Sequence, residues 1–128
     1  MYQPKYALIV KALEKYGTVY SQFVSDEALS EYGETRLPDA EIFERERNTL
    51  LKCDVVVAEV TTPSLGVGYL IASATLQQKK VVALYAGEDT SKLSAMINGD
   101  PGVEVYTYKA DGDIERILMG ALVGSVSK

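Results

Sequence analysis

Apolar residues in the stretch 4–16 recur every three or four positions, the spacing of one helix face. Gly17 follows directly and can end this helix. Residues 18–24 are β-branched and aromatic with roughly alternating polarity, which predicts a strand at a sheet edge or half exposed. The polar stretch 25–39 predicts a loop before the next helix.

Residues 40–52 again show helical spacing, with apolar side chains on one stripe and charged ones mostly outside it. Glu46 breaks this pattern, because it lies four positions after Ile42 and four before Leu50, on the face that should be buried. A carboxylate there must pair, shift its pKa or face a cavity. Glu46 is therefore a candidate acid or base, and the alternative is a structural ion pair with a neighbouring arginine.

The run VVVAEV after Asp54 is apolar except for Glu59, as in a parallel strand covered on both faces. The segment TTPSLGVGY follows it, residues from about 66 to 78 continue as a helix, and KVVALY at 80–85 is the next strand. These elements form a βαβ unit. Glu59 is a weaker candidate at the ligand edge, where it could equally pair with backbone amides.

The rest of the chain continues the alternation, with a short helix at 90–98, a strand VEVYTY from Val103 and a helix at 113–123. This order predicts an α/β domain with a largely parallel sheet and helices on both faces. Ligands bind such sheets beyond the carboxyl ends of the strands, near the point where strand order reverses. The segment TTPSLGVG lies at one of these ends.

Composition narrows the function. The length of 128 residues predicts one domain over residues 1–128, and the absence of histidine excludes histidine-based catalysis and histidine metal ligands. The single Cys53 cannot form an internal disulfide, and a net charge of -5 argues against nucleic acid or anionic membranes as partners. No apolar run approaches the roughly 20 residues of a membrane span, and the N-terminus lacks signal-peptide features. We expect a cytoplasmic protein, or a nuclear one in a eukaryote.

The residues Ser64, Gly66 and Gly68 combine a hydroxyl, two glycines and the start of a helix, which can present backbone N–H groups to a phosphate. The alternative is that Ser64 only caps the helix while the glycines allow a tight turn. The segment is neither a GxGxxG fingerprint nor a Walker A loop, because the third glycine and the Gly-Lys-Ser/Thr ending are missing. The local pattern leaves both interpretations open.

The stretch CDVVVAEVTTPSLGVGY, followed after KKVVALY by LSAMING, resembles the 2'-deoxynucleoside 5'-monophosphate N-glycosidases of the nucleoside 2-deoxyribosyltransferase superfamily. The similarity runs from the first helix nearly to the C-terminus. It implies a homodimeric, flavodoxin-like or Rossmann-like domain that releases the base and deoxyribose 5-phosphate from a deoxynucleoside 5'-monophosphate without a metal or other cofactor. In that family a glutamate attacks C1', a nearby aspartate assists, and water resolves the covalent intermediate, as in retaining glycosidases.

The resemblance also implies binding residues. Ser64 and the amides around Gly66 and Gly68 match phosphate-binding positions of the family, and Ser94 in LSAMI matches a serine donated by the partner subunit. We therefore expect a homodimer in which Ser94 reaches across the interface.

Three departures from the family pattern bear on activity. The family's GVGYE reads GVGYL here, so Leu70 stands at the position of the nucleophile and cannot attack. The assisting aspartate matches Glu46, whose carboxylate lies about one methylene further from the backbone. Relatives also begin with an apolar strand and a Ser-Ile-Arg-Gly-Gly-like turn, whereas this chain starts at the helix that follows. Losing about four or five buried side chains, at roughly 1.5 to 3 kcal/mol each, is comparable to a domain's net stability. We therefore favour an incomplete chain over a rearranged sheet.

These features predict an N-glycosidase-like protein that binds a nucleoside 5'-monophosphate and whose catalysis is impaired by Leu70, unless Glu46 or Glu59 substitutes for the missing carboxylate. The alternatives are a non-catalytic nucleotide-binding homologue, a nucleoside deoxyribosyltransferase and, last, an interaction domain that binds no nucleotide.

Overall fold

The computed structural model describes the backbone of residues 3–17 and 37–126, and the side chains of residues 7–17 and 37–123. The strand predicted at 18–24 and most of the loop at 25–39 lie outside these residues. No helix within them is long and apolar enough to cross a membrane. In chain order the described elements are α1 (Gln3–Leu13), α3 (Asp39–Lys52), β1 (Val55–Glu59), α4 (Leu65–Leu76), β2 (Lys80–Ala86), the 3₁₀-helix η2 (Thr90–Lys92), α5 (Ala95–Asn98), β3 (Val103–Tyr108) and α6 (Asp111–Val126).

The described strands form one parallel sheet in the order β1-β2-β3. Val55 of β1 lies opposite Lys80 of β2, and Val81 lies opposite Val103 of β3. All three carboxyl ends therefore lie at the same edge of the sheet. Helix α4 connects β1 to β2, which confirms the predicted βαβ unit.

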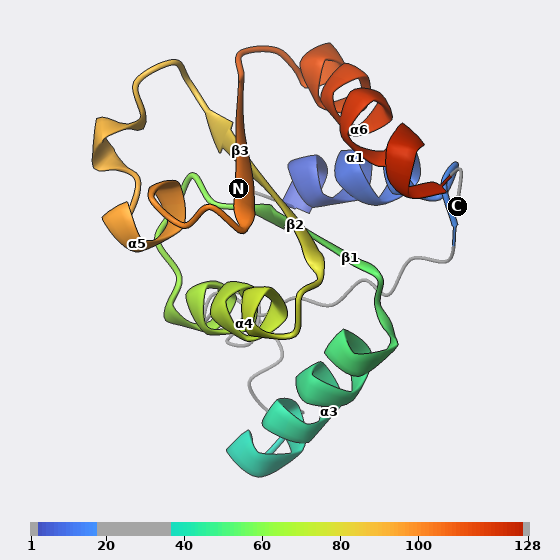
Figure 1. Cartoon of the computed structure of the whole chain (residues 1–128), viewed down its shortest axis with the longest axis vertical. Coiled ribbons are helices and arrows are strands. Elements are labelled where there is room, and N and C mark those ends of the chain that lie inside the picture. Colours follow the sequence, from blue (N-terminus) through green and yellow to red (C-terminus); the bar gives the residue numbers. More distant parts are fainter. Residues whose placement is uncertain (1–2, 18–36, 127–128) are drawn as a thin grey trace.

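Helices cover both faces of this sheet (Figure 1): α1 and α6 lie on one face, and α3 and α4 on the other. Strand β2 supplies both cores because side chains alternate along a strand. Val82 and Leu84 pack towards α6, whereas Val81 and Ala83 pack towards α4, and all four are fully buried. The α/β architecture predicted from the element order is confirmed.

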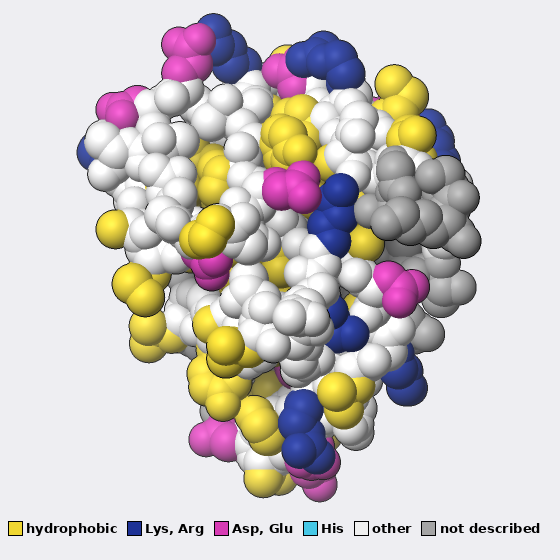
Figure 2. Space-filling model, in the orientation of Figure 1, with side chains coloured by type: hydrophobic (Ala, Val, Ile, Leu, Met, Phe, Trp, Pro, Cys, Tyr) yellow, Lys and Arg dark blue, Asp and Glu magenta, His cyan; other side chains and the backbone are white. Residues whose placement is uncertain are grey.

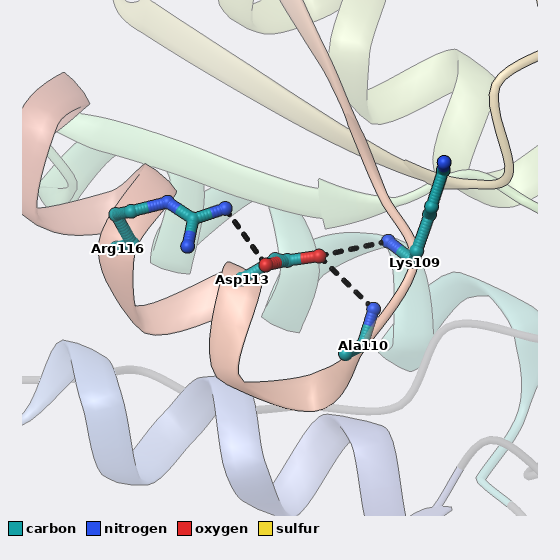
Figure 3. A network of polar contacts seen from close by, with 4 residues as sticks. All are labelled: Lys109, Ala110, Asp113 and Arg116. Atoms are coloured by element: carbon teal, nitrogen blue, oxygen red, sulfur yellow. Dashed lines mark hydrogen bonds and ion pairs between the residues drawn. The ribbon is translucent and has the colours of Figure 1, made fainter.

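Backbone capping sets where α6 begins. The Asp113 carboxylate accepts hydrogen bonds from the backbone N–H groups of Lys109 at 3.1 Å and Ala110 at 3.0 Å, and forms an ion pair with Arg116 at 2.7 Å (Figure 3). These contacts, the backbone ones foremost, lower the pKa of Asp113 from 3.8 to about 2. They hold the two residues just before the helix, as in one half of a capping box, and α6 starts at Asp111, two residues before the predicted position.

The single helix predicted over residues 90–98 is wrong. The structure has η2, then Leu93 with an extended backbone (ψ 142°), and then the separate helix α5. The Ser94 hydroxyl accepts a hydrogen bond from the Met96 N–H at 3.2 Å and so caps a new helix start. A serine competes well for such a cap, and here that local bond interrupts the helical pattern.

Candidate functional site

The segment between β1 and α4 ends in a capped helix start at the carboxyl edge of the sheet. The Ser64 hydroxyl accepts a hydrogen bond from the Val67 N–H at 3.3 Å, and the Ser64 carbonyl accepts one from the Gly68 N–H at 3.0 Å. The predicted cap is therefore confirmed. The prediction that the glycines form the turn before the helix is wrong, because Gly66 and Gly68 lie within the first turns of α4. The cap occupies the N–H groups of Val67 and Gly68, so an anion at this helix start would have to bind the N–H groups of Leu65 and Gly66.

This helix start is open to solvent. Leu65, the first residue of α4, is 94% exposed. A Cβ placed on Gly68 would meet no heavy atom within 4 Å, so the backbone there can be approached closely. The first turn of α4 carries no acidic residue. The partial positive charge of the helix N-terminus is thus left without a carboxylate from its own first turn, which favours a bound anion.

Glu46 lies in α3 with its side chain 12% exposed, as its position on the apolar stripe predicted. Its Oε2 atom lies 3.0 Å from Nη2 and 3.1 Å from Nε of Arg45. The structural ion pair considered from the sequence is therefore present. Burial raises the pKa of Glu46, and the Arg45 guanidinium opposes that shift only in part. A largely buried carboxyl with a raised pKa can accept a proton more readily than an exposed one.

Leu70 lies in the second turn of α4, where it packs against the core shared with α3. The preceding residue, Tyr69, is exposed, and its ring meets Phe43 of α3 edge to face, with the ring centroids 6.2 Å apart. Phe43 stands one helical turn before Glu46. Glu46 and Leu70, the two positions expected from the resemblance to bear on catalysis, therefore lie on helices that touch through this aromatic pair.

Ser94 is exposed at the start of α5, and Met96 beside it is 83% exposed. Within one chain, each of the two candidate serines caps its own helix: Ser64 bonds the Val67 amide and Ser94 the Met96 amide. A site that uses both serines thus requires the two helix starts to converge on one ligand.

The structure places Glu59 in a buried polar cluster at the same sheet edge, and the sequence analysis missed its partners Thr61 and Tyr108. Glu59, at the end of β1, is 7% exposed. Its Oε1 accepts from the Thr61 N–H at 2.9 Å, and its Oε2 accepts from the Thr61 hydroxyl at 2.6 Å and from the Tyr108 hydroxyl. The Thr61 hydroxyl also accepts from the Ala86 N–H at 2.9 Å. Pairing of Glu59 with a backbone amide, the alternative considered from the sequence, is confirmed. The one sequence feature that could have indicated the role of Tyr108 is its position at the end of a predicted strand.

Comparison with known proteins identifies the family. No family model matches the chain. A 5-hydroxymethyl-dUMP N-hydrolase of Danio rerio is 42% identical over 116 residues, which cover 88% of this chain and 80% of that protein. One of Esox lucius is 44% identical over 118 residues, covering 88% and 81%. The chain belongs to the 2'-deoxynucleoside 5'-phosphate N-hydrolase family.

These relatives confirm the family membership that the segment VVVAEVTTPSLGVGY indicated. Its fold also matches the solved structure of the CMP N-glycosidase BcmB of Clostridium botulinum, with a TM-score of 0.62 over 92% of both chains. At 16% identity this likeness supports the fold alone. Among the described residues, no three His, Cys, Asp or Glu side chains are grouped so as to hold a metal ion.

Proposed function

We propose that the chain binds a deoxynucleoside 5'-monophosphate, with the phosphate at Ser64 and the amides around Gly66 and Gly68, and hydrolyses its N-glycosidic bond. The observation that carries the proposal is the identity of 42% and 44% to two 5-hydroxymethyl-dUMP N-hydrolases over about four fifths of their length. The open, uncharged start of α4 supports the position of the phosphate, because helix amides and the helix dipole favour a bound anion.

Glu46 is the carboxylate best placed to act in this chain. Leu70 removes the family's nucleophile, so a covalent intermediate cannot form at that position. Glu59 accepts three hydrogen bonds and is buried, which commits its oxygens to protein donors. Glu46 then takes a proton from a water molecule whose oxygen attacks C1', and the bond from C1' to the base breaks with its electron pair leaving on the base. In this route a carboxylate that is ion-paired with Arg45 replaces the family's nucleophile, so we expect slow turnover.

The test compares base release by the wild type and two variants at position 70. Leu70→Glu restores a carboxylate, and Leu70→Gln is a matched control of the same shape without the charge. With dUMP and 5-hydroxymethyl-dUMP as substrates, liquid chromatography should detect slow release by the wild type, faster release by Leu70→Glu and no gain for Leu70→Gln. Rapid wild-type turnover that Leu70→Glu leaves unchanged or lowers would contradict the assignment of position 70.

The proposed site is shared between two copies of the chain. Figure 2 shows hydrophobic side chains gathered on the side of the molecule where α5 and the start of α4 lie. The large exposed residues in the first turns of α4 and in α5 are Leu65, Tyr69 and Met96. An exposed apolar patch of this kind is typical of a protein interface. Because Leu65 adjoins Ser64 and Met96 lies beside Ser94, a second copy covering this patch would bring the two serines towards one ligand.

Mixing two variants that each bind nucleotide weakly tests whether the site is shared. Ser64→Ala and Ser94→Ala should each weaken nucleotide binding, as measured by calorimetry. After subunits are exchanged in an equal mixture, half of the dimers are mixed and each holds one intact site, so about a quarter of the sites should recover. A mixture that binds no better than its components would exclude the donation of Ser94 across the interface, and light scattering would show directly whether the chain is a dimer.

A non-catalytic nucleotide-binding homologue is the second candidate, and the packing of Leu70 into the core favours it. In that case the same calorimetry would show binding while long incubation releases no free base. A deoxyribosyltransferase would instead release base only when a second base is present as acceptor. These outcomes separate the three functions.

A further inference from the structure

We infer that Glu59, acting through Thr61, is a positioning residue that holds the segment 60–64 so that the start of α4 can receive a phosphate. We call the contacts among Glu59, Thr61, Ala86 and Tyr108 the strand-end clamp. The identity of the ligand rests on the proposed function, whereas the role of the clamp rests on the geometry of the described residues.

The clamp ties together the ends of all three described strands. Glu59 ends β1, Ala86 ends β2 and Tyr108 ends β3. The Tyr108 hydroxyl reaches Glu59 across β2, and the Ala86 N–H reaches the Thr61 hydroxyl. The backbone continues the same connection, since the Gly87 N–H donates to the Tyr108 carbonyl at 2.8 Å. The clamp therefore sets where the chain leaves β1 relative to the other strands.

Thr61 is the part of the clamp that acts on the candidate site. Its hydroxyl donates to Glu59 at 2.6 Å and accepts from Ala86 at 2.9 Å, so its only proton is already used within the protein. Three residues later Ser64 is held by its bonds to Val67 and Gly68. Two residues separate these anchors, and one of them is Pro63, whose φ is restricted by its ring. Fixing Thr61 thus limits the positions that Ser64 can take.

The chemistry of the clamp requires a carboxylate. Three donors converge on the two oxygens of Glu59, and the carboxylate group can only accept. A glutamine in the same place has a single acceptor oxygen, and its NH₂ group would face at least one of the donors. A carboxylate that is both buried and fully hydrogen-bonded is costly to place, and a contact at the surface would not require it.

The test uses a matched pair at position 61. Thr61→Val keeps the shape and removes the hydroxyl, whereas Thr61→Ser keeps the hydroxyl and removes a methyl group. Thr62→Val is the control, because Thr62 is the exposed neighbour in the same segment. Amide hydrogen exchange of Val67 and Gly68 reports the helix start without any ligand, and exchange of Gln77 reports the far end of the same helix.

We expect Thr61→Val to speed exchange at Val67 and Gly68 about tenfold, the factor associated with one lost hydrogen bond to a charged group, and to leave Gln77 unchanged. Thr61→Ser and Thr62→Val should exchange like the wild type. Equal acceleration at Val67, Gly68 and Gln77 would mean a general loss of stability and would overturn the inference, as would unchanged exchange in a folded Thr61→Val protein.

Calorimetric titration with dUMP completes the experiment. If the wild type binds, Thr61→Val should weaken the affinity about tenfold and Thr61→Ser should restore it. If the wild type binds and Thr61→Val binds equally well, the positioning role is wrong although the proposed function stands. If the wild type does not bind dUMP or 5-hydroxymethyl-dUMP while Thr61→Val still loosens the helix start, the proposed function fails and the clamp on segment 60–64 stands.

Discussion

The hydroxyl of Tyr108 provides a direct measure of the strand-end clamp. Tyr108 is 3% exposed and donates to the buried Glu59 carboxylate. Tyr108→Phe removes this one oxygen and keeps the ring in the core. A hydrogen bond to a charged group contributes about 1.5 to 3 kcal/mol, and Glu59 keeps both donors from Thr61. We therefore expect the free energy of unfolding to fall by about 1.5 kcal/mol, the lower end of this range.

A double-mutant cycle separates this bond from other effects of the substitutions. Glu59→Gln should destabilise the protein by about 1 to 3 kcal/mol, because a buried donor loses its acceptor. Glu59→Gln removes at least the charge-assisted part of the bond from Tyr108, and Tyr108→Phe removes the same part, so the double variant loses it only once and the two effects should fall short of additivity by about 1 kcal/mol. Independent sites add to within about 0.5 kcal/mol.

Urea denaturation followed by circular dichroism measures all four proteins at one pH. Tyr106→Phe is a matched control on the same strand, since the Tyr106 hydroxyl donates to Glu104 at 2.7 Å in a half-exposed setting. Its removal should cost less than about 1 kcal/mol, as for other exposed polar contacts. The reasoning is refuted if Tyr108→Phe costs no more than Tyr106→Phe, or if the cycle is additive within about 0.5 kcal/mol.

Two further predictions concern the pH dependence of unfolding, measured by denaturation at several pH values. Asp113→Asn should lower stability near neutral pH, and its difference from the wild type should shrink as the pH falls from about 4 to 2, because the pKa of Asp113 is lowered to about 2 and its contribution requires the ionised form. A constant difference would contradict this. Glu46→Gln should gain stability relative to the wild type as the pH rises above about 4.5, because burial raises the pKa of Glu46 and folding favours its protonated form. If Glu46→Gln instead gained stability relative to the wild type as the pH falls, the raised pKa of Glu46 would be contradicted.

Local patterns in the sequence were sufficient for most elements. Apolar spacing places α3 within one residue of its observed start, and the apolar run after Asp54 marks β1, because burial against a sheet or helix leaves a periodic trace in the chain. The unexpected position of Glu46 on the apolar stripe also predicts its partial burial. The break at Ser94 was missed, because a single capping bond there outweighs a weak helical pattern.

By itself, the sequence determined the family and the alternation of helices and strands. Only the tertiary structure decided how Glu59 is used, since its partner Tyr108 lies 49 positions away in the chain. The physical reason is that parallel strands bring their carboxyl ends to one edge whatever their separation in sequence. No periodic pattern marks such a contact, so a carboxylate that could have bound a ligand proves to join three strand ends.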